Sequence, residues 1–278
     1  MFRRDLLSIV RAHPSDTDGL AYTHGTEENE FILSGAARSS STGKTYQIKN
    51  GYLDLLGGKT GAGNIANATN YLPGTGRGYE PLWRVRSLSL LTGETFSNER
   101  EVEKISNLVG AERGGKYLDL GCSAGLYSRS LASRLDADGH VVGLDIAPSM
   151  LREAARLTAT MNPAYRPSLV RADAGALPFQ DGVFSGAVCG GSLNEFADPA
   201  RVLRETHRVL KPGGRLAIMG ILSARTTGGR RLQRFLSTGG IQFFSPDELY
   251  SLLSHAGFQP DPIETYGAVF FAGATRTS

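Results

Sequence analysis

The residues best suited to bind a small charged ligand lie in the segment 117–127, Tyr-Leu-Asp-Leu-Gly-Cys-Ser-Ala-Gly-Leu-Tyr. An apolar strand predicted there runs into Gly121, and Gly125 follows at the start of a predicted helix. Glycine at these two positions permits a tight turn and lets the backbone approach a ligand closely. Asp119, two residues before the turn, provides a carboxylate that can accept a hydrogen bond or pair with a cation.

Two further acidic residues follow the next two predicted strands. Asp145 ends the apolar segment 141–145 and lies 26 residues after Asp119. An acid at the end of a second strand is placed to hold a ribose, because two hydroxyl donors suit two carboxylate oxygens. Asp173 follows the third strand. The three acids together predict a nucleotide-like site.

The same loop argues against a dinucleotide such as a nicotinamide or flavin cofactor. The dinucleotide fingerprint requires G-x-G-x-x-G, and Ser123 stands where the middle glycine would be. Asp119 would repel a pyrophosphate, whereas it would attract a sulfonium or an amino-acid cation. The glycine pairs at 61–63 and 74–76 neither follow a clear strand nor open a helix.

The elements that must position these residues alternate between strands and helices from residue 116 onward. Strands are predicted at 117–120, 140–144, 168–171, 186–189, 215–221 and 268–272, and helices at 126–135, 149–160, 199–210 and 245–256. Such alternation predicts an α/β fold with a parallel sheet covered by helices on both faces. In that architecture, ligands bind outside the carboxyl ends of the strands.

Residues 1–115 are less regular and contain several clusters of Gly, Ser, Thr and Asn. Two short stretches, 30–33 and 45–55, are predicted to pair as a hairpin around a turn at 39–43. A helix is predicted over 98–109, since acidic residues fall in its first turn and apolar residues recur at helical spacing.

Composition limits the classes of function. The net charge of +3 gives no strong electrostatic footprint for a nucleic-acid polymer. The two cysteines, Cys122 and Cys189, are too few and too far apart for a zinc ribbon or a disulfide-stapled fold, and we expect both to be buried core residues. No apolar run reaches the roughly 18 residues of a membrane span, so a cytoplasmic protein without membrane insertion is expected.

These motifs resemble those of class I S-adenosylmethionine-dependent methyltransferases, over about residues 80–278. The matching segments are 118–125 for the first motif, 143–145 for the acid after the second strand, 171–173 for the adenine-side acid and 210–216 for the turn into the fifth strand. Segments 50–55 and 79–84 resemble the quinone-biosynthesis branch, which includes plastid enzymes and carries a zinc-ribbon-like module. The module's cysteines are absent here, so the resemblance implies a metal-free relic.

The resemblance implies a Rossmann-like, doubly wound, mainly parallel seven-stranded sheet with an irregular N-terminal extension. It divides the chain into a degenerate ribbon-like module with a lid or substrate segment over 1–95 and a cofactor-binding domain over 96–278. The chain departs from the family pattern at two places. Ser123 replaces the middle glycine, and the segment 184–188 lacks the acid that usually follows its phenylalanine.

The resemblance also implies a set of cofactor-binding residues. They are Asp119, Gly121, Cys122, Ser123, Gly125, Asp145, Ile146, Met150, Asp173, Ala174, Gly190, Tyr79, Trp83 and Arg84. Asp119 would lie near the methionine ammonium, Asp145 would accept the ribose hydroxyls, and Asp173 would accept the adenine amino group. Ile146 would pack on the adenine, and the residues from 79–84 would close over the cofactor. No metal ligand is implied.

Asn194 and Glu195 follow the fourth strand, at the rim where the methyl group should point. Glu195 is a candidate general base for a hydroxyl, or a group that orients the acceptor. The alternative for this pair is a solvated capping role before the next helix. The arginines of the 225–234 segment are either a solvated face or contacts to an anionic substrate.

The resulting hypothesis is methyl transfer from S-adenosylmethionine to a small, planar or apolar metabolite, with S-adenosylhomocysteine as product. The protein would supply alignment, water exclusion and one base. The sequence leaves open the acceptor atom and the oligomeric state. Two alternatives remain at this point: a non-methylating use of the fold, such as cyclisation or rearrangement, and an RNA methyltransferase, which would need a basic face.

Overall fold

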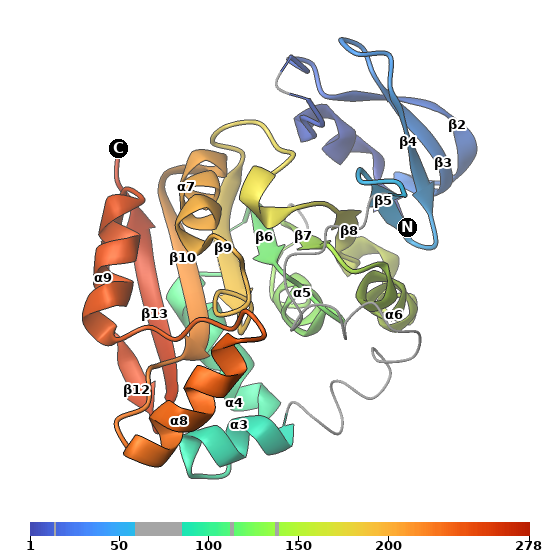
Figure 1. Ribbon diagram of the computed structural model, residues 1–278. Helices are drawn as coiled ribbons and strands as arrows, with labels where there is room; N and C mark the ends of the chain where they lie inside the picture. The colour runs from blue at the N-terminus through green and yellow to red at the C-terminus, as the bar shows by residue number, and fades with distance from the viewer. Residues whose placement is uncertain (14, 59–84, 112–113, 137–138) are drawn as a thin grey trace.

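The computed structural model describes residues 1–13, 15–58, 85–111, 114–136 and 139–278 (Figure 1). A mixed β-sheet runs through this part of the chain, with helices on both faces. Tyr79, Trp83 and Arg84, expected to close over the cofactor, lie outside the described residues.

Seven neighbouring strands of a 13-stranded sheet correspond to the seven-stranded sheet that the family resemblance implies; six of them were predicted from the sequence pattern, and β11 was not. In sheet order they are β8 (Ser168–Arg171), β7 (His140–Asp145), β6 (Lys116–Leu120), β9 (Phe184–Gly190), β10 (Leu210–Ile221), β13 (Val269–Arg276) and β11 (Phe258–Pro260). The first five are parallel, and β13 is antiparallel to both of its neighbours. A short strand, β12 (Glu264–Tyr266), also pairs with β13. The predicted Rossmann-like, mainly parallel sheet is therefore confirmed.

The two faces of the sheet bury separate cores because side chains alternate along each strand. Leu118 on β6 packs in the core that includes helices α7 (Pro199–Val209) and α9 (Pro246–His255). Its neighbour Tyr117 points the other way, into the core of helices α4 (Asn98–Val109) and α5 (Leu126–Ala132). Helix α6 (Pro148–Thr158) contributes to a third, smaller cluster.

The N-terminal strands continue the same sheet beyond β8 (Figure 1). They are β1 (Phe2–Arg3), β2 (Leu20–Glu28), β3 (Phe31–Ser39), β4 (Thr45–Lys49) and β5 (Tyr52–Asp54), with a 3-10 helix at Arg4–Ile9. Strand β5 runs parallel to β8 and joins the two parts edge to edge. In the described residues, no group of three or more His, Cys, Asp or Glu side chains is arranged to hold a metal ion.

Several element boundaries differ from the predictions. The hairpin around 39–43 is confirmed by the pairing of β3 with β4. The single strand over 45–55 is wrong, because Asn50 and Gly51 take φ values of 55° and 85° and make a second hairpin turn between β4 and β5. The helix predicted over 126–135 ends at Ala132.

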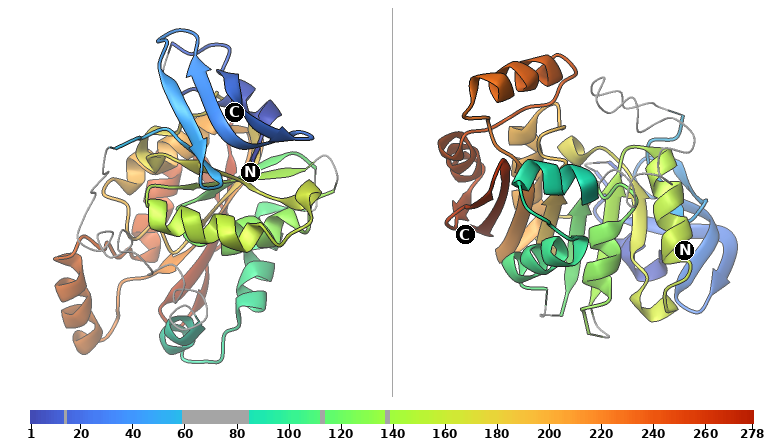
Figure 2. Two further views of the ribbon diagram at one scale, coloured as in Figure 1. Left: turned by 90° about the vertical axis from the view of Figure 1, so that its right-hand side faces the viewer. Right: turned by 90° about the horizontal axis from the view of Figure 1, so that it is seen from below.

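Helices α3 (Val85–Thr92) and α8 (Thr227–Ser237) were not predicted. Helix α8 begins with glycines and arginines and buries none of its residues, so its sequence carries no core-facing stripe. Figure 2 shows α8 standing out from the body of the molecule. None of the helices in the described residues is long and apolar enough to cross a membrane.

Candidate cofactor site

The loop after β6 turns at the point where the strand order reverses, between β6 and β9. Gly121 has a φ of 64°, and a Cβ atom there would lie 2.4 Å from the hydroxyl oxygen of Ser192. The Ser192 hydroxyl donates to the Gly121 carbonyl at 3.0 Å. Glycine is therefore required at 121, since the loops after β6 and β9 are in contact there. Ligands of doubly wound sheets bind at such a switch point.

Ser123, the departure from the family pattern, has a left-handed backbone with a φ of 50°. Its N–H donates to Asp145 Oδ2 at 2.8 Å, and its hydroxyl lies 3.5 Å from the Met150 sulfur. Serine thus takes the conformation that glycine adopts most easily, at the cost of some backbone strain. The substitution keeps the loop shape and its bond to the acid after β7.

The Asp145 carboxylate has the acceptor atoms expected for holding a ribose. Its Oδ2 accepts from Ser123 N–H and its Oδ1 accepts from Ala147 N–H, both at 2.8 Å. Burial raises the pKa of this carboxyl, while the backbone N–H groups lower it in part. Each carboxylate oxygen has two lone pairs, so each retains acceptor capacity for a hydroxyl. The residues present therefore fit a ribose-bearing cofactor.

Asp119 is buried, with 1% of its surface exposed. It therefore lies deeper than a carboxylate on the surface that could bind an ammonium directly. Its Oδ2 accepts from the Ser128 hydroxyl at 2.6 Å, from the first turn of α5. The negative charge of Asp119 contributes to the raised thiol pKa values of Cys122 and Cys189, after burial. Asp119 therefore lies beneath the glycine loop and supplies negative potential there.

The residues expected on the adenine side follow β7 and β8. Ile146 is partly exposed beside Asp145. Asp173 is exposed, and its carboxylate accepts from Gly175 N–H at 2.8 Å, which caps a 3-10 turn at Ala174–Ala176. The Arg171 Nε donates to the Ile146 carbonyl at 3.1 Å. The two loops are thus held together by Arg171, which sequence reasoning treated only as part of a motif.

Gly190 is required by an aromatic ring that the sequence did not single out. A Cβ atom at Gly190 would lie 1.7 Å from a carbon of the Tyr127 ring. The Tyr127 hydroxyl donates to the carboxylate of the fully buried Glu101 on α4. The Tyr127 ring therefore packs directly against the backbone at the end of β9, the place expected to face the sulfonium.

The side chain of Asn194 is engaged by three backbone bonds. Its Oδ1 accepts from Ile221 N–H at 2.9 Å, and its Nδ2 donates to the Ile221 and Gln242 carbonyls at 2.9 and 2.6 Å. Asn194 is also 2% exposed. These bonds tie the end of β9 to the end of β10 and to the chain returning toward α9.

Glu195 differs from Asn194 in exposure and in charge environment. It is partly exposed, and burial together with the negative charge of Asp145 raises its pKa to about 7. The charge of Asp145, at the end of β7, therefore disfavours ionisation of Glu195, which follows β9. A carboxyl with a pKa near neutrality can hold or release a proton under physiological conditions.

The two cysteines are buried and unpaired, as expected. Burial raises the pKa of Cys189 to about 12 and that of Cys122 well above its usual value. Neither thiol is therefore an activated nucleophile.

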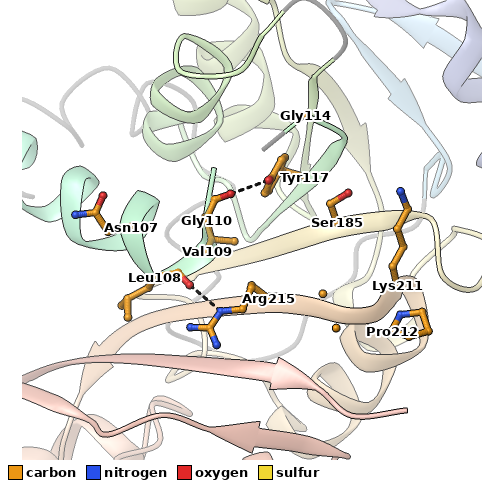
Figure 3. A pocket seen from close by; sticks show the side chains of 12 residues that line it. Asn107, Leu108, Val109, Gly110, Gly114, Tyr117, Ser185, Lys211, Pro212 and Arg215 are labelled. Carbon is orange, nitrogen blue, oxygen red and sulfur yellow. Dashed lines mark hydrogen bonds between the residues drawn. The ribbon is translucent and has the colours of Figure 1, made fainter. Parts of the chain in front are cut away.

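A cavity of about 370 Å³ lies at the opposite edge of the sheet, where β6, β9 and β10 begin (Figure 3). It is crossed by hydrogen bonds from Tyr117 to the Gly110 carbonyl and from Arg215 to the Leu108 carbonyl. None of the residues predicted to bind the cofactor lines it.

Comparison with known proteins identifies the central domain. A family described as a methyltransferase domain matches residues 118–218. A 2-phytyl-1,4-naphtoquinone methyltransferase of Nostoc punctiforme is 38% identical over 109 residues, which cover 39% of this chain and 47% of that protein. A demethylmenaquinone methyltransferase of Lactiplantibacillus plantarum is 40% identical over 102 residues, 37% of this chain and 43% of that one. The chain spans about half the length of the curated relatives it matches.

Solved structures share the fold at low identity. Phosphoethanolamine N-methyltransferase 2 of Haemonchus contortus, in complex with S-adenosylhomocysteine, has a TM-score of 0.61 and 15% identity over 77% of this chain and 59% of that chain. The cyclase SpnF has a TM-score of 0.56 and 21% identity over 64% of this chain and 80% of that chain. The motif order, the strand order and the family match agree. Residues 118–218 therefore match a methyltransferase domain, this part of the chain is similar in sequence to quinone methyltransferases, and the fold is that of S-adenosylmethionine-dependent methyltransferases.

Proposed function

We propose that this protein transfers a methyl group from S-adenosylmethionine to a planar, apolar small molecule of the quinol type. The observation that carries the proposal is the hydrogen bonding at the switch point, where Asp145 accepts from the N–H groups of Ser123 and Ala147, and Asn194 fixes the loop that carries Glu195. The pKa of Glu195, raised by burial to about 7, supports its assignment as a base. The relatives that share the domain at 38% and 40% identity are named for naphthoquinone and menaquinone methylation, which supports the acceptor class.

S-Adenosylmethionine, when bound, supplies a methyl group activated by its sulfonium. Asp145 would accept the ribose hydroxyls, and Ile146 and Asp173 would bind the adenine side. Gly190, without a side chain above the Tyr127 ring, lets the backbone approach the sulfonium. The protein thereby aligns the reacting groups and excludes water, which is the main contribution that such a displacement requires.

Glu195 is the residue we assign to proton removal from the acceptor. Its carboxylate, ionised above a pH of about 7, accepts the proton of an acceptor hydroxyl, which makes the neighbouring ring carbon nucleophilic toward the methyl group. After the C–C bond forms, the ring C–H bond breaks and that proton moves to the oxygen, which restores the quinol, so the proton on Glu195 is the net proton released. Asn194 acts as a positioning residue, because its three backbone bonds fix the loop that carries Glu195.

The division into a module over 1–95 and a cofactor-binding domain over 96–278 is part of this proposal. The N-terminal module would help to bind the acceptor, and the pairing of β5 with β8 supports a fixed arrangement of the two parts. A cytoplasmic location and the absence of a nucleic-acid partner stay predictions from the sequence.

The test has a binding arm and a reaction arm. Calorimetric titration with S-adenosylhomocysteine should give micromolar binding for the wild type and for Asp18→Ala, an exposed acid in the N-terminal part, and much weaker binding for Asp145→Ala. A reduced naphthoquinone lacking its ring methyl should gain the mass of one methylene. An unchanged mass with altered connectivity would instead support the non-methylating use of the fold.

A further inference from the structure

Helix α8 exposes large apolar side chains to water. Phe235 is 72% exposed, Leu232 59% and Leu236 36%, and no residue of the helix is buried. A helix on a globular protein normally turns its apolar stripe to the core, and one of 11 residues gains little stability alone. Neighbouring exposed apolar side chains of this size mark a surface that contacts a partner.

A basic stripe accompanies the apolar one. Arg230, Arg231 and Arg234 lie on α8 and Arg225 just before it, all of them exposed. Residues 206–246 include no Asp or Glu. None of the ion pairs between described residues involves these four arginines. The partner is therefore expected to be anionic as well as apolar.

Helix α8 is held at the carboxyl edge of the sheet by a few polar bonds. Gln233 accepts from Ala224 N–H at 2.7 Å and donates to the Leu222 carbonyl at 2.9 Å. β10 ends at Ile221 and the chain comes back alongside it at Phe244, which bridges to Leu222; the Asn194 side chain bonds to Ile221 and Gln242, on either side of α8. Helix α8 follows the carboxyl end of β10, and Asn194, the neighbour of Glu195, bonds to the chain before and after the helix. The helix therefore lies at the same edge of the sheet as the glycine loop (Figure 1).

We propose that α8 is a membrane-surface helix that lies in the interface of an anionic lipid bilayer. Leu232, Phe235 and Leu236 enter the boundary between headgroups and acyl chains, and the arginines contact lipid phosphates. An in-plane helix with one apolar face and a face rich in Arg has the pattern of interfacial anchors. This is peripheral binding, which requires no membrane-spanning helix.

The position of α8 suggests what membrane binding would do for the protein, and this step rests on the proposed function. A bilayer bound by α8 would lie beside the edge that carries Glu195, so an apolar acceptor dissolved in the membrane could reach the site without crossing water. The lipid contact itself depends only on α8 and is tested separately from methyl transfer.

The experiment is flotation of the full chain with vesicles of phosphatidylglycerol and phosphatidylcholine, compared with phosphatidylcholine alone. The wild type should bind the anionic vesicles, and added salt should weaken binding. Phe235→Ser should lower the partition coefficient about tenfold. Each of Arg231→Gln and Arg234→Gln should lower it about fivefold. All these positions are exposed, so the variants should retain the wild-type melting temperature.

The control variants replace an exposed aromatic residue and an exposed arginine that lie away from α8. Tyr165→Ser and Arg204→Gln also change exposed residues and should bind vesicles as the wild type does. No binding of the wild type to anionic vesicles at low salt would overturn the proposal, and so would equal binding of Phe235→Ser. A concentration-dependent dimer that Phe235→Ser abolishes, without vesicle binding, would assign the face to a second copy and also overturn it.

A further readout separates this inference from the proposed function. Phe235→Ser should bind S-adenosylhomocysteine with unchanged affinity, because none of the residues proposed to bind the cofactor lies on α8. Vesicle binding by a wild-type protein that fails to bind S-adenosylhomocysteine would leave the membrane helix standing and remove the proposed function.

Discussion

Asp54 and Arg171 form a buried ion pair where the N-terminal strands join the catalytic sheet. Arg171 Nη1 lies 3.2 Å from both Asp54 carboxylate oxygens, and the two residues are register partners on β5 and β8. Arg171 Nε also donates to the Ile146 carbonyl, in the loop expected to hold the adenine. One guanidinium therefore connects strand β5 to the loop after β7.

Replacing Asp54 should affect both stability and cofactor binding. Asp54→Asn should lower the free energy of unfolding by about 3 kcal/mol, because it leaves the Arg171 charge buried without its partner. Binding of S-adenosylhomocysteine should weaken as the Ile146 loop loses its fixed contact. Urea unfolding and calorimetry measure the two effects. Glu27→Gln, which breaks the exposed pair with Arg4, should cost less than about 1 kcal/mol, and an equal loss in both variants would contradict this role.

Substitutions at Ser123 should distinguish backbone strain from side-chain chemistry. Ser123→Gly should stay within about 1 kcal/mol of the wild type, because relief of the left-handed strain offsets the added entropy of the unfolded chain. Ser123→Val should destabilise by more than about 1 kcal/mol, since a β-branched residue tolerates a positive φ poorly. Thermal unfolding and S-adenosylhomocysteine titration check both. Loss of binding in Ser123→Gly would mean that the hydroxyl itself contacts the cofactor.

Gly190 should not accept a methyl group. Gly190→Ala should cost about 1–3 kcal/mol, because the new Cβ would collide with the Tyr127 ring. The collision should also displace the backbone expected to approach the sulfonium and so lower the methylation rate. Gly58→Ala is the matched control, since a Cβ at Gly58 has open space around it. Unfolding curves for the two variants that coincide would show that the ring moves freely.

The central sheet could be predicted because its signals are local. The strands from β6 to β9 and the second half of β10 are short and mostly apolar, and Asp145 and Asp173 stand at the carboxyl ends where the chain pattern puts them. The contacts made by Arg171, Tyr127 and Glu101 could not be predicted, since they join residues far apart in the sequence. Arg171 and Asp54 are 117 positions apart and meet only because β5 pairs with β8.

Asn194 and Glu195 illustrate the same limit at the site itself. Both stand at the rim after β9 in the sequence, as two adjacent polar residues of similar size. Packing gives the two side chains different environments. Asn194 turns inward and bonds to the backbone at the end of β10, while Glu195 remains partly exposed near Asp145. Helix α8 was missed for the opposite reason, because periodicity reports burial against the protein's own core and α8 has none.

The pH dependence of the protein should report Glu195. Its pKa is raised from 4.5 to about 7 in the folded state, so ionisation of Glu195 is less favourable there than in the unfolded chain. Its contribution to stability is therefore fully present below about pH 4.5 and is lost as the pH rises through about 7. Glu195→Gln should unfold with about 1–3 kcal/mol more stability than the wild type at pH 8, and with little difference at pH 4.5.

Activity should follow the opposite trend, because the base must be ionised. The wild-type kcat/KM for methyl transfer should rise with pH and level off above about 7, and Glu195→Gln should be slower by a factor of about 100 or more, without that inflection. Asn194→Ala should lower stability yet keep the inflection, since it changes the support of the base and leaves the base in place. An inflection that survives in Glu195→Gln would assign proton removal to another group.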